Sequence, residues 1–129
     1  MSDQFENPPA AHTEAPRLLS SNAVDGIPIF GRDGDRLGTV AAFMIDRFTG
    51  RVDYVVVAMG RVLGLGGSFH PLPWSAVAYE PRLEGYMLGV ERSLLSSGPS
   101  FKSPSDAVFD AAYSERISTY YGAPLPRRD

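Results

Sequence analysis

The sequence predicts a mainly β protein: a small barrel followed by one C-terminal helix. Two long apolar runs on either side of the short turn Asp46–Gly50 predict a β-hairpin. Elsewhere glycines and prolines separate short apolar segments, which predicts further strands joined by turns. Only one stretch, near the C-terminus, has apolar residues at helical spacing. The chain has 129 residues, which is enough for one domain with tails.

The composition divides the chain into three parts. Residues 1–17 are polar and contain Pro8, Pro9 and Pro16, so they bury too little apolar surface to offset the entropy of ordering, and we expect a flexible tail. Residues 18–96 are expected to form the barrel domain. Residues 97–129 are expected to hold a polar linker, an amphipathic helix and a short tail.

The first strand and its turn are predicted from local chemistry. Ile27, Ile29 and Phe30 indicate a strand, and Pro28 places it at a sheet edge or at a strand start. Asp33-Gly34 then predicts a tight turn, because glycine adopts a positive φ without steric cost.

Both faces of the predicted hairpin are apolar. On its second strand, Val56 and Ala58 share one face while Val55 and Val57 share the other. A hairpin with one solvated face would alternate apolar and polar residues, so something must cover each side. One face can line a barrel, and the other needs a helix or a second subunit. The alternation of residues along the strand does not show which face lines the barrel and which lies outside. Our working hypothesis places Val55 and Val57 on the outer face.

A helix that could cover the outer face is predicted after residue 103. Ser103 is a candidate N-cap, followed by Pro104 at the first helical position and by Asp106. Gly122 with Pro124 is expected to end the helix. The apolar stripe between these signals consists of Phe109, Ala112, Tyr113, Ile117, Tyr120 and Tyr121.

The glycine-rich stretch Gly64–Gly67 raises the question of a phosphate-binding loop. Such a loop needs backbone N–H groups at the start of a helix, usually with a lysine directly after the glycines. No lysine follows here, and Pro71 and Pro73 favour extended backbone instead. The sequence therefore favours a sharp bend between strands.

No catalytic, cofactor or metal site is predicted. The chain has no cysteine, and its only other histidine besides His70 is His12 in the expected tail. A lone histidine is more often packed or hydrogen-bonded than catalytic, and the carboxylates fall in turns. Trp74 is either core or the aromatic anchor of an interface, with core favoured.

Charge and hydropathy restrict the partners. The formal net charge is -3, with no basic stripe, so nucleic acid is not an expected partner. No window reaches the length of an apolar membrane span, and the N-terminus does not resemble a secretory signal. Together with the lack of cysteine, this leads us to expect a cytoplasmic protein.

The order of these features resembles the PRC-barrel family, which includes the cytoplasmic domain of the photosynthetic reaction centre H subunit. The resemblance rests on LLSSNAVDGIPIFGRDGDRLGTV, IDRFTGRVDYVVV, GLGG and HPLPWSAVAY, within residues 18–95. The C-terminal Tyr-Tyr-Gly is similar to that of stand-alone bacterial members. The resemblance implies a barrel of about six strands acting as a non-enzymatic module, a homodimer that docks on another protein. By analogy it also implies, more remotely, a peripheral component of a membrane complex.

The candidate binding residues come from the apolar hairpin face assigned to the outside, the segment around Trp74 and the apolar stripe of the predicted C-terminal helix. They are Val55, Val57, Phe69, His70, Trp74, Phe109, Tyr113, Tyr120 and Tyr121. The alternative function is a barrel that binds a small ligand or senses a metabolite. Its pocket is expected near Trp74, His70 and the glycine bend.

Overall fold

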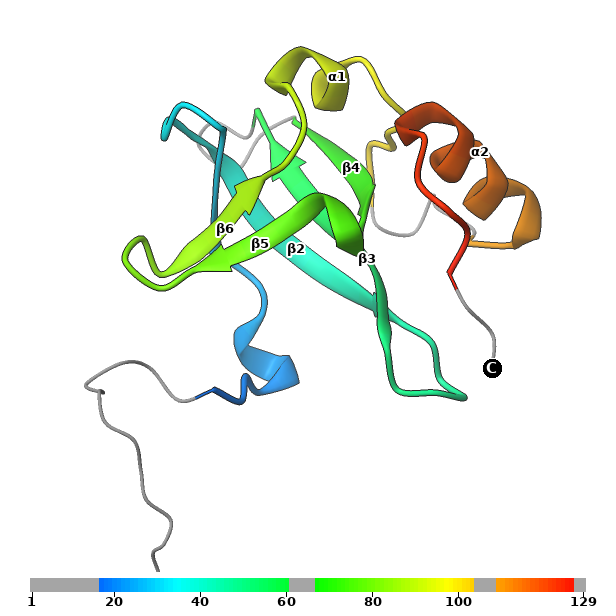
Figure 1. Ribbon diagram of the computed structural model, residues 1–129, viewed down its shortest axis with the longest axis horizontal. Helices are drawn as coiled ribbons and strands as arrows, with labels where there is room; N and C mark the ends of the chain where they lie inside the picture. The colour runs from blue at the N-terminus through cyan, green and yellow to red at the C-terminus, as the bar shows by residue number, and fades with distance from the viewer. Residues whose placement is uncertain (1–16, 61–66, 104–108, 127–129) are drawn as a thin grey trace, which may run out of the picture.

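The computed structural model describes residues 17–60, 67–103 and 109–126, and it contains one sheet with helices beside it (Figure 1). The strands are β1 (Pro28–Phe30), β2 (Arg36–Ile45), β3 (Val52–Met59), β4 (Ser68–Pro73), β5 (Val77–Glu80) and β6 (Gly85–Leu88). The helices are the 3-10 turns η1 (Ser21–Ala23) and η2 (Trp74–Ala76), the short α1 (Arg92–Ser96) and α2 (Ala111–Tyr121).

The six strands form a curled half-barrel in the order β4-β3-β2-β1-β6-β5. Neighbouring strands are antiparallel except β1 and β6, which are parallel. The two outermost strands, β4 and β5, are joined through η2 alone. Three residues span at most about 10 Å, so the sheet must curl until its edges approach each other at that end. The mainly β fold with about six strands and a C-terminal helix is therefore confirmed.

Both predicted turns are confirmed. Between β2 and β3, the Asp46 carboxylate accepts hydrogen bonds from the backbone N–H of Phe48 (2.8 Å) and Thr49 (3.2 Å), and Gly50 has a φ of 80°. Between β1 and β2, Gly34 has a φ of 92°. Pro28 is the first residue of β1, where its missing N–H costs the ladder nothing.

The placement of Val55 and Val57 on the outer face was wrong. Both side chains are fully buried inside the half-barrel, where they lie opposite Leu72 and His70 of β4. The outward face of β3 carries Val56, together with Tyr54 and Ala58. The sequence did not separate the two sets because both faces of this strand are buried, and both are therefore apolar.

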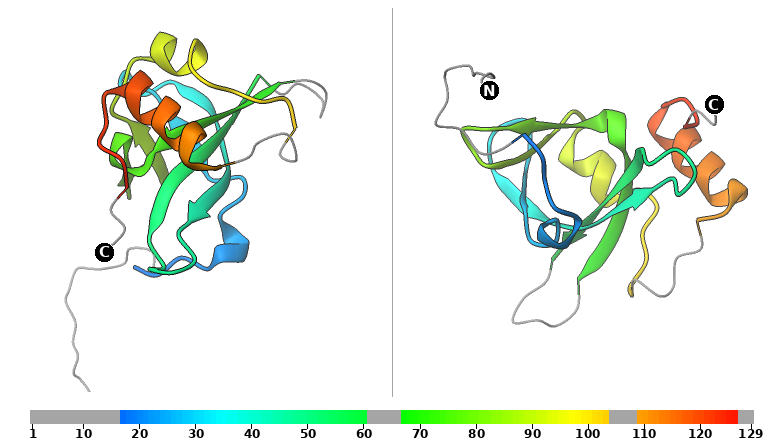
Figure 2. Two further views of the ribbon diagram at one scale, coloured as in Figure 1. Left: turned by 90° about the vertical axis from the view of Figure 1, so that its right-hand side faces the viewer. Right: turned by 90° about the horizontal axis from the view of Figure 1, so that it is seen from below.

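The chain covers its own outer sheet face with its C-terminal segment. Phe101 stacks on Phe69 of β4 at 5.6 Å between ring centroids, and Phe109 packs against Tyr54 of β3 at 5.6 Å. Helix α2 lies beside β4, as the left view of Figure 2 shows, and fully buries Ile117. The second apolar face of the hairpin is thus covered within one chain.

The helix α2 begins later than predicted. Its N-cap is Asp110, whose carboxylate accepts a hydrogen bond from the backbone N–H of Tyr113 at 2.9 Å, so the expected cap at Ser103 is wrong. Pro104 and Asp106 lie outside the described residues. The predicted end is confirmed, because Gly122 closes the helix in the left-handed conformation with a φ of 65°.

Candidate functional site

Four aromatic side chains gather at the end of the half-barrel where η2 joins β4 to β5. Two of them expose more than a third of their surface: Trp74 at 37% and Tyr79 at 45%. Trp74 packs on Phe43 with 5.1 Å between ring centroids and on Tyr86 with 5.8 Å, and Tyr79 meets Tyr86 edge-on at 5.2 Å. We call these four residues, Phe43, Trp74, Tyr79 and Tyr86, the aromatic patch.

Strand register explains why the aromatic patch assembles. Tyr79 of β5 lies directly opposite Tyr86 of β6, so both side chains point to the same, inner side of the sheet. Phe43 of β2 lies opposite the inward Val55, which places it on that side too. Burial, with a smaller contribution from Tyr79, raises the pKa of Tyr86. Tyr86 is therefore uncharged at neutral pH.

His70 lies inside the half-barrel and is almost completely buried. Its Nε2 atom is 2.7 Å from the Ser68 hydroxyl. Burial is the larger influence and lowers the pKa of His70, while the backbone of Leu95 opposes the shift. The ring is thus neutral at pH 7, as a packed and hydrogen-bonded side chain.

The aromatic residues of the helical stripe are used within the chain. Phe109 and Tyr113 meet edge-on at 5.1 Å, and the Tyr120 hydroxyl donates a 2.6 Å hydrogen bond to the Leu94 carbonyl of α1. Burial is the main cause that raises the pKa of the Tyr121 hydroxyl. These contacts hold α2 against its own domain.

The contact between α2 and α1 depends on Gly98. A Cβ at that position would lie 2.8 Å from a ring carbon of Tyr120 and 2.9 Å from the hydroxyl of Tyr121. Both distances are closer than van der Waals contact allows. The absence of a side chain at Gly98 therefore lets the two tyrosines dock.

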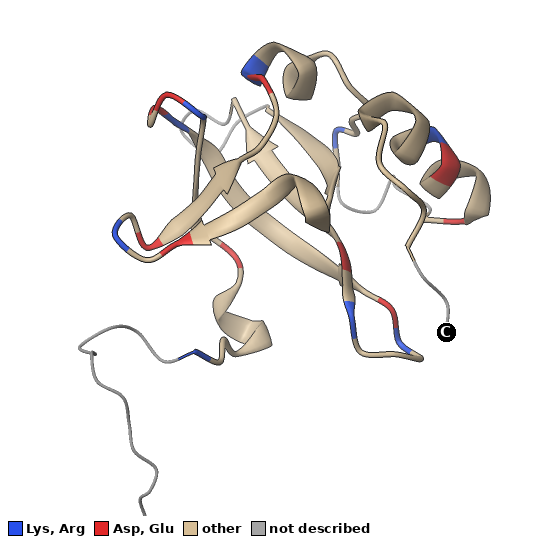
Figure 3. Cartoon of the chain, in the orientation of Figure 1, with Lys and Arg blue, Asp and Glu red and all other residues tan. Residues whose placement is uncertain are grey.

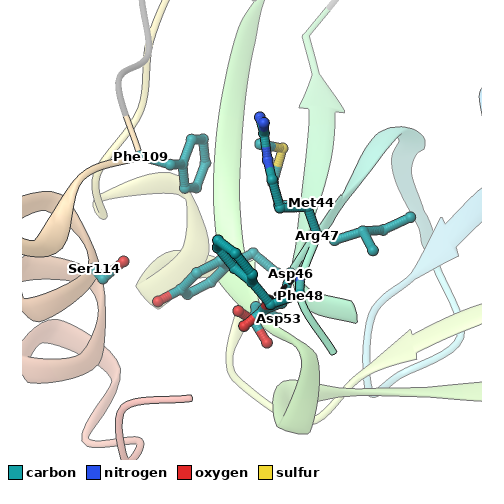
Figure 4. A pocket seen from close by; sticks show the side chains of 9 residues that line it. Met44, Asp46, Arg47, Phe48, Asp53, Phe109 and Ser114 are labelled. Atoms are coloured by element: carbon teal, nitrogen blue, oxygen red, sulfur yellow. Dashed lines mark hydrogen bonds between the residues drawn. The ribbon is translucent and has the colours of Figure 1, made fainter. Parts of the chain in front are cut away.

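A pocket of about 310 Å³ lies between the β2–β3 turn and α2 (Figure 4). The buried Tyr54 hydroxyl on its wall has no hydrogen-bond partner among the described residues. Neither Trp74 nor His70 lines this pocket, so it differs from the predicted ligand pocket. Residues 61–66, which hold most of the glycine bend, lie outside the described part of the chain. Its lining residues are Met44, Ile45, Asp46, Arg47, Phe48, Asp53, Tyr54, Phe109 and Ser114.

Comparison with protein families decides the membership of the chain. The family model of the PRC-barrel domain matches residues 18–88, which is more than half of the sequence. The chain belongs to the PRC-barrel family. No curated protein sequence matches the chain. The matched range runs from the segment before η1 to the end of β6, so it includes all six strands of the PRC barrel.

Charged residues of this PRC barrel lie in turns, at the ends of strands and on the helices, with both signs mixed (Figure 3). Across residues 17–60, 67–103 and 109–126, no three His, Cys, Asp or Glu side chains come together as a metal site. Within the same ranges, no helix has the length and apolar character needed to cross a membrane.

Three members of the aromatic patch, Phe43, Tyr79 and Tyr86, were absent from the sequence-based candidates. The pattern YEPRLEGY contained the signal for Tyr79, because its two outer tyrosines flank the Pro81–Glu84 turn symmetrically and must face each other in a hairpin. Phe43 had no such signal. An irregularity in the pairing with β3, between Val40 and Ala42, shifts the inward side of β2, and sequence parity does not reveal that shift.

Proposed function

We propose that this PRC barrel is a non-catalytic binding and assembly module that self-associates and docks on another protein. The observation that supports the proposal is the aromatic patch. Trp74 and Tyr79 expose more than a third of their surface, while Phe43 packs against the Trp74 ring and Tyr86 packs against the Tyr79 ring. Rigid, partly exposed Trp and Tyr side chains lose little conformational entropy on binding and are typical anchors of protein interfaces.

The proposed interface differs from the one expected from the sequence. Val55 and Val57 are inside the half-barrel, and Tyr120 and Tyr121 dock on the chain's own α1 region. The two valines would reach a partner only if the domain opened, and the two half-buried tyrosines are already engaged in contacts within the chain. The aromatic patch needs no such opening, because Trp74 and Tyr79 already reach the surface.

The first experiment measures self-association by light scattering during gel filtration over a wide range of concentration. We expect the full chain to reach twice the monomer mass, and Trp74→Ala to shift the protein towards the monomer, since truncation removes the largest anchor. Phe48→Ala is the matched control. That side chain is 93% exposed but lies at the β2–β3 turn, so its removal should leave the mass unchanged. A wild-type chain that stays monomeric throughout would contradict self-association.

A second experiment tests docking on another protein. A photo-crosslinking amino acid replaces Trp74 in living cells, and the same amino acid replaces Phe48 in the control. We expect the Trp74 position to give defined adducts, one with the mass of two copies and one with the mass of a different protein. If both positions give the same adducts, or neither gives any, the aromatic patch is not the docking surface.

A further inference from the structure

One edge of the sheet is open. Strand β5 is the last strand in the order, and of the described helices and strands it makes extended contacts with β6 alone. The backbone N–H of Gly89 donates to the Ala76 carbonyl at 2.7 Å. Residues whose main-chain groups point towards the partner strand alternate with residues whose groups point away from it in an antiparallel pair. Since Ala76 is bonded to Gly89, the residue that follows β6, the main-chain groups of Ala78 also point towards β6, while those of Val77 and Tyr79 point outwards. The Val77 N–H is bonded to the Trp74 carbonyl, which makes Tyr79 the outward donor of β5.

The opposite edge, β4, is closed. Phe69 exchanges two backbone hydrogen bonds of 2.9 Å with Phe101, so its main chain points away from β3. By the same alternation Pro71 and Pro73 point outwards as well, and neither has an N–H to offer. Prolines at an edge prevent another strand from adding to it. Among the strands that the structure describes, the sheet can therefore be extended only at β5.

We infer that two copies of this PRC barrel associate by antiparallel pairing of their β5 strands about a two-fold axis. This inference rests on the self-association proposed above and assigns the surface that carries it. The Tyr79 N–H of each copy donates to an outward carbonyl of the other, so the pairing is reciprocal, as a two-fold interface requires. The aromatic patches lie on the same sheet face as Tyr79 and would meet across the axis.

The composition of β5 suits pairing with itself. Its sequence Val-Ala-Tyr-Glu carries one charge, and this lies at the strand end. In an antiparallel pair the two copies of Glu80 fall at opposite ends, so like charges do not face each other. Ala78, whose side chain is exposed on the outer face, is small enough for the two strands to approach closely.

The test compares two substitutions of one residue by light scattering of the full chain. Tyr79→Ala removes the ring but keeps the N–H, whereas Tyr79→Pro removes both. The Tyr79 N–H points away from β6, so proline leaves the native ladder intact, which thermal unfolding would verify. We expect Tyr79→Pro to raise the dimer dissociation constant over that of Tyr79→Ala by on the order of tenfold. Equal dissociation constants would overturn strand pairing.

A cysteine crosslink provides a second readout that does not depend on the proline variant folding. The chain has no cysteine, so Ala78→Cys introduces a single thiol on the outer side of β5. We expect a disulfide-linked dimer to form under mild oxidation, and Phe48→Cys to give none at the same concentration. A wild-type dimer that resists both tests would refute pairing through β5 while leaving self-association intact. A wild-type monomer would refute both.

Discussion

Val55 lies fully inside the half-barrel, where a charged side chain would have no partner. We expect Val55→Glu to prevent folding, because an unpaired charge cannot be buried there. Val55→Ala should lower the free energy of unfolding by about 2 kcal/mol, through lost burial and the cavity it leaves. Urea unfolding followed by circular dichroism measures both. Phe48→Glu, at an exposed position, is the control; equal behaviour of the two glutamate variants would show that Val55 faces outwards.

His70 makes the stability of the domain depend on pH. Its pKa in the folded protein is lowered by burial, below the 6.5 of an unperturbed histidine. Between the two pKa values the unfolded state binds more protons than the folded state. The contribution of the neutral ring is therefore complete above pH 6.5 and is lost as the pH falls towards the folded pKa.

The measurement that checks this expectation is the melting temperature as a function of pH. We expect wild type to lose stability between pH 7 and pH 5.5 more steeply than His70→Gln, because glutamine does not titrate. Other titrating groups are common to both proteins and cancel in the difference. Parallel curves would mean that His70 has the same pKa in both states.

At the scale of elements, α2 begins at Asp110 and depends on that residue for its first turn. Asp110→Ala removes the acceptor for the Tyr113 N–H, so we expect the free energy of unfolding to fall by about 1 kcal/mol. Asp110→Asn keeps a capping oxygen and should stay close to wild type. Chemical denaturation of the three proteins decides the matter. Similar losses in both variants would indicate that the charge matters rather than the cap.

Elements defined by adjacent residues were predictable from the sequence, and elements defined by distant contacts were not. The Asp46–Gly50 and Asp33-Gly34 turns follow from side chains that bond their own backbone and from glycines at positive φ. The orientation of β3 depends on which face the remote Phe109 segment covers. The start of α2 was missed because Ser103 and Asp110 are both good caps, and propensity does not choose between them.

The candidate site shows the same division. Trp74 was predictable as a candidate because a single tryptophan in a small domain is either core or anchor, and it is packed on one side and exposed on the other. Its role as part of a patch requires β2, η2, β5 and β6 to meet, which only the curl of the sheet achieves. The tyrosines of α2 were candidates for a partner because amphipathic spacing does not tell which chain the apolar stripe will cover.

For the whole molecule, α2 covers the outer face of the sheet. Ending the chain before Ser103 would remove Phe109 and α2 and so expose Tyr54 and its neighbours on the outer face, so we expect a lower melting temperature and strong binding of a hydrophobic dye. Self-association through the aromatic patch should not require α2. Calorimetry and dye fluorescence on the shortened and full chains test this. An equally stable, dye-silent shortened chain would mean that the outer face has another cover.

The closed edge at β4 limits the number of other chains that can pair with this sheet. A sheet with two free edges can add a neighbour on each side and grow without limit into a fibre. Here Pro71, Pro73 and the Phe101 bridge leave β5 as the one sheet edge, among the described strands, that can pair with a strand of another chain. Once that edge is paired, the assembly has no further strand edge to which a chain could add. The protein can therefore expose an unpaired edge strand without polymerising.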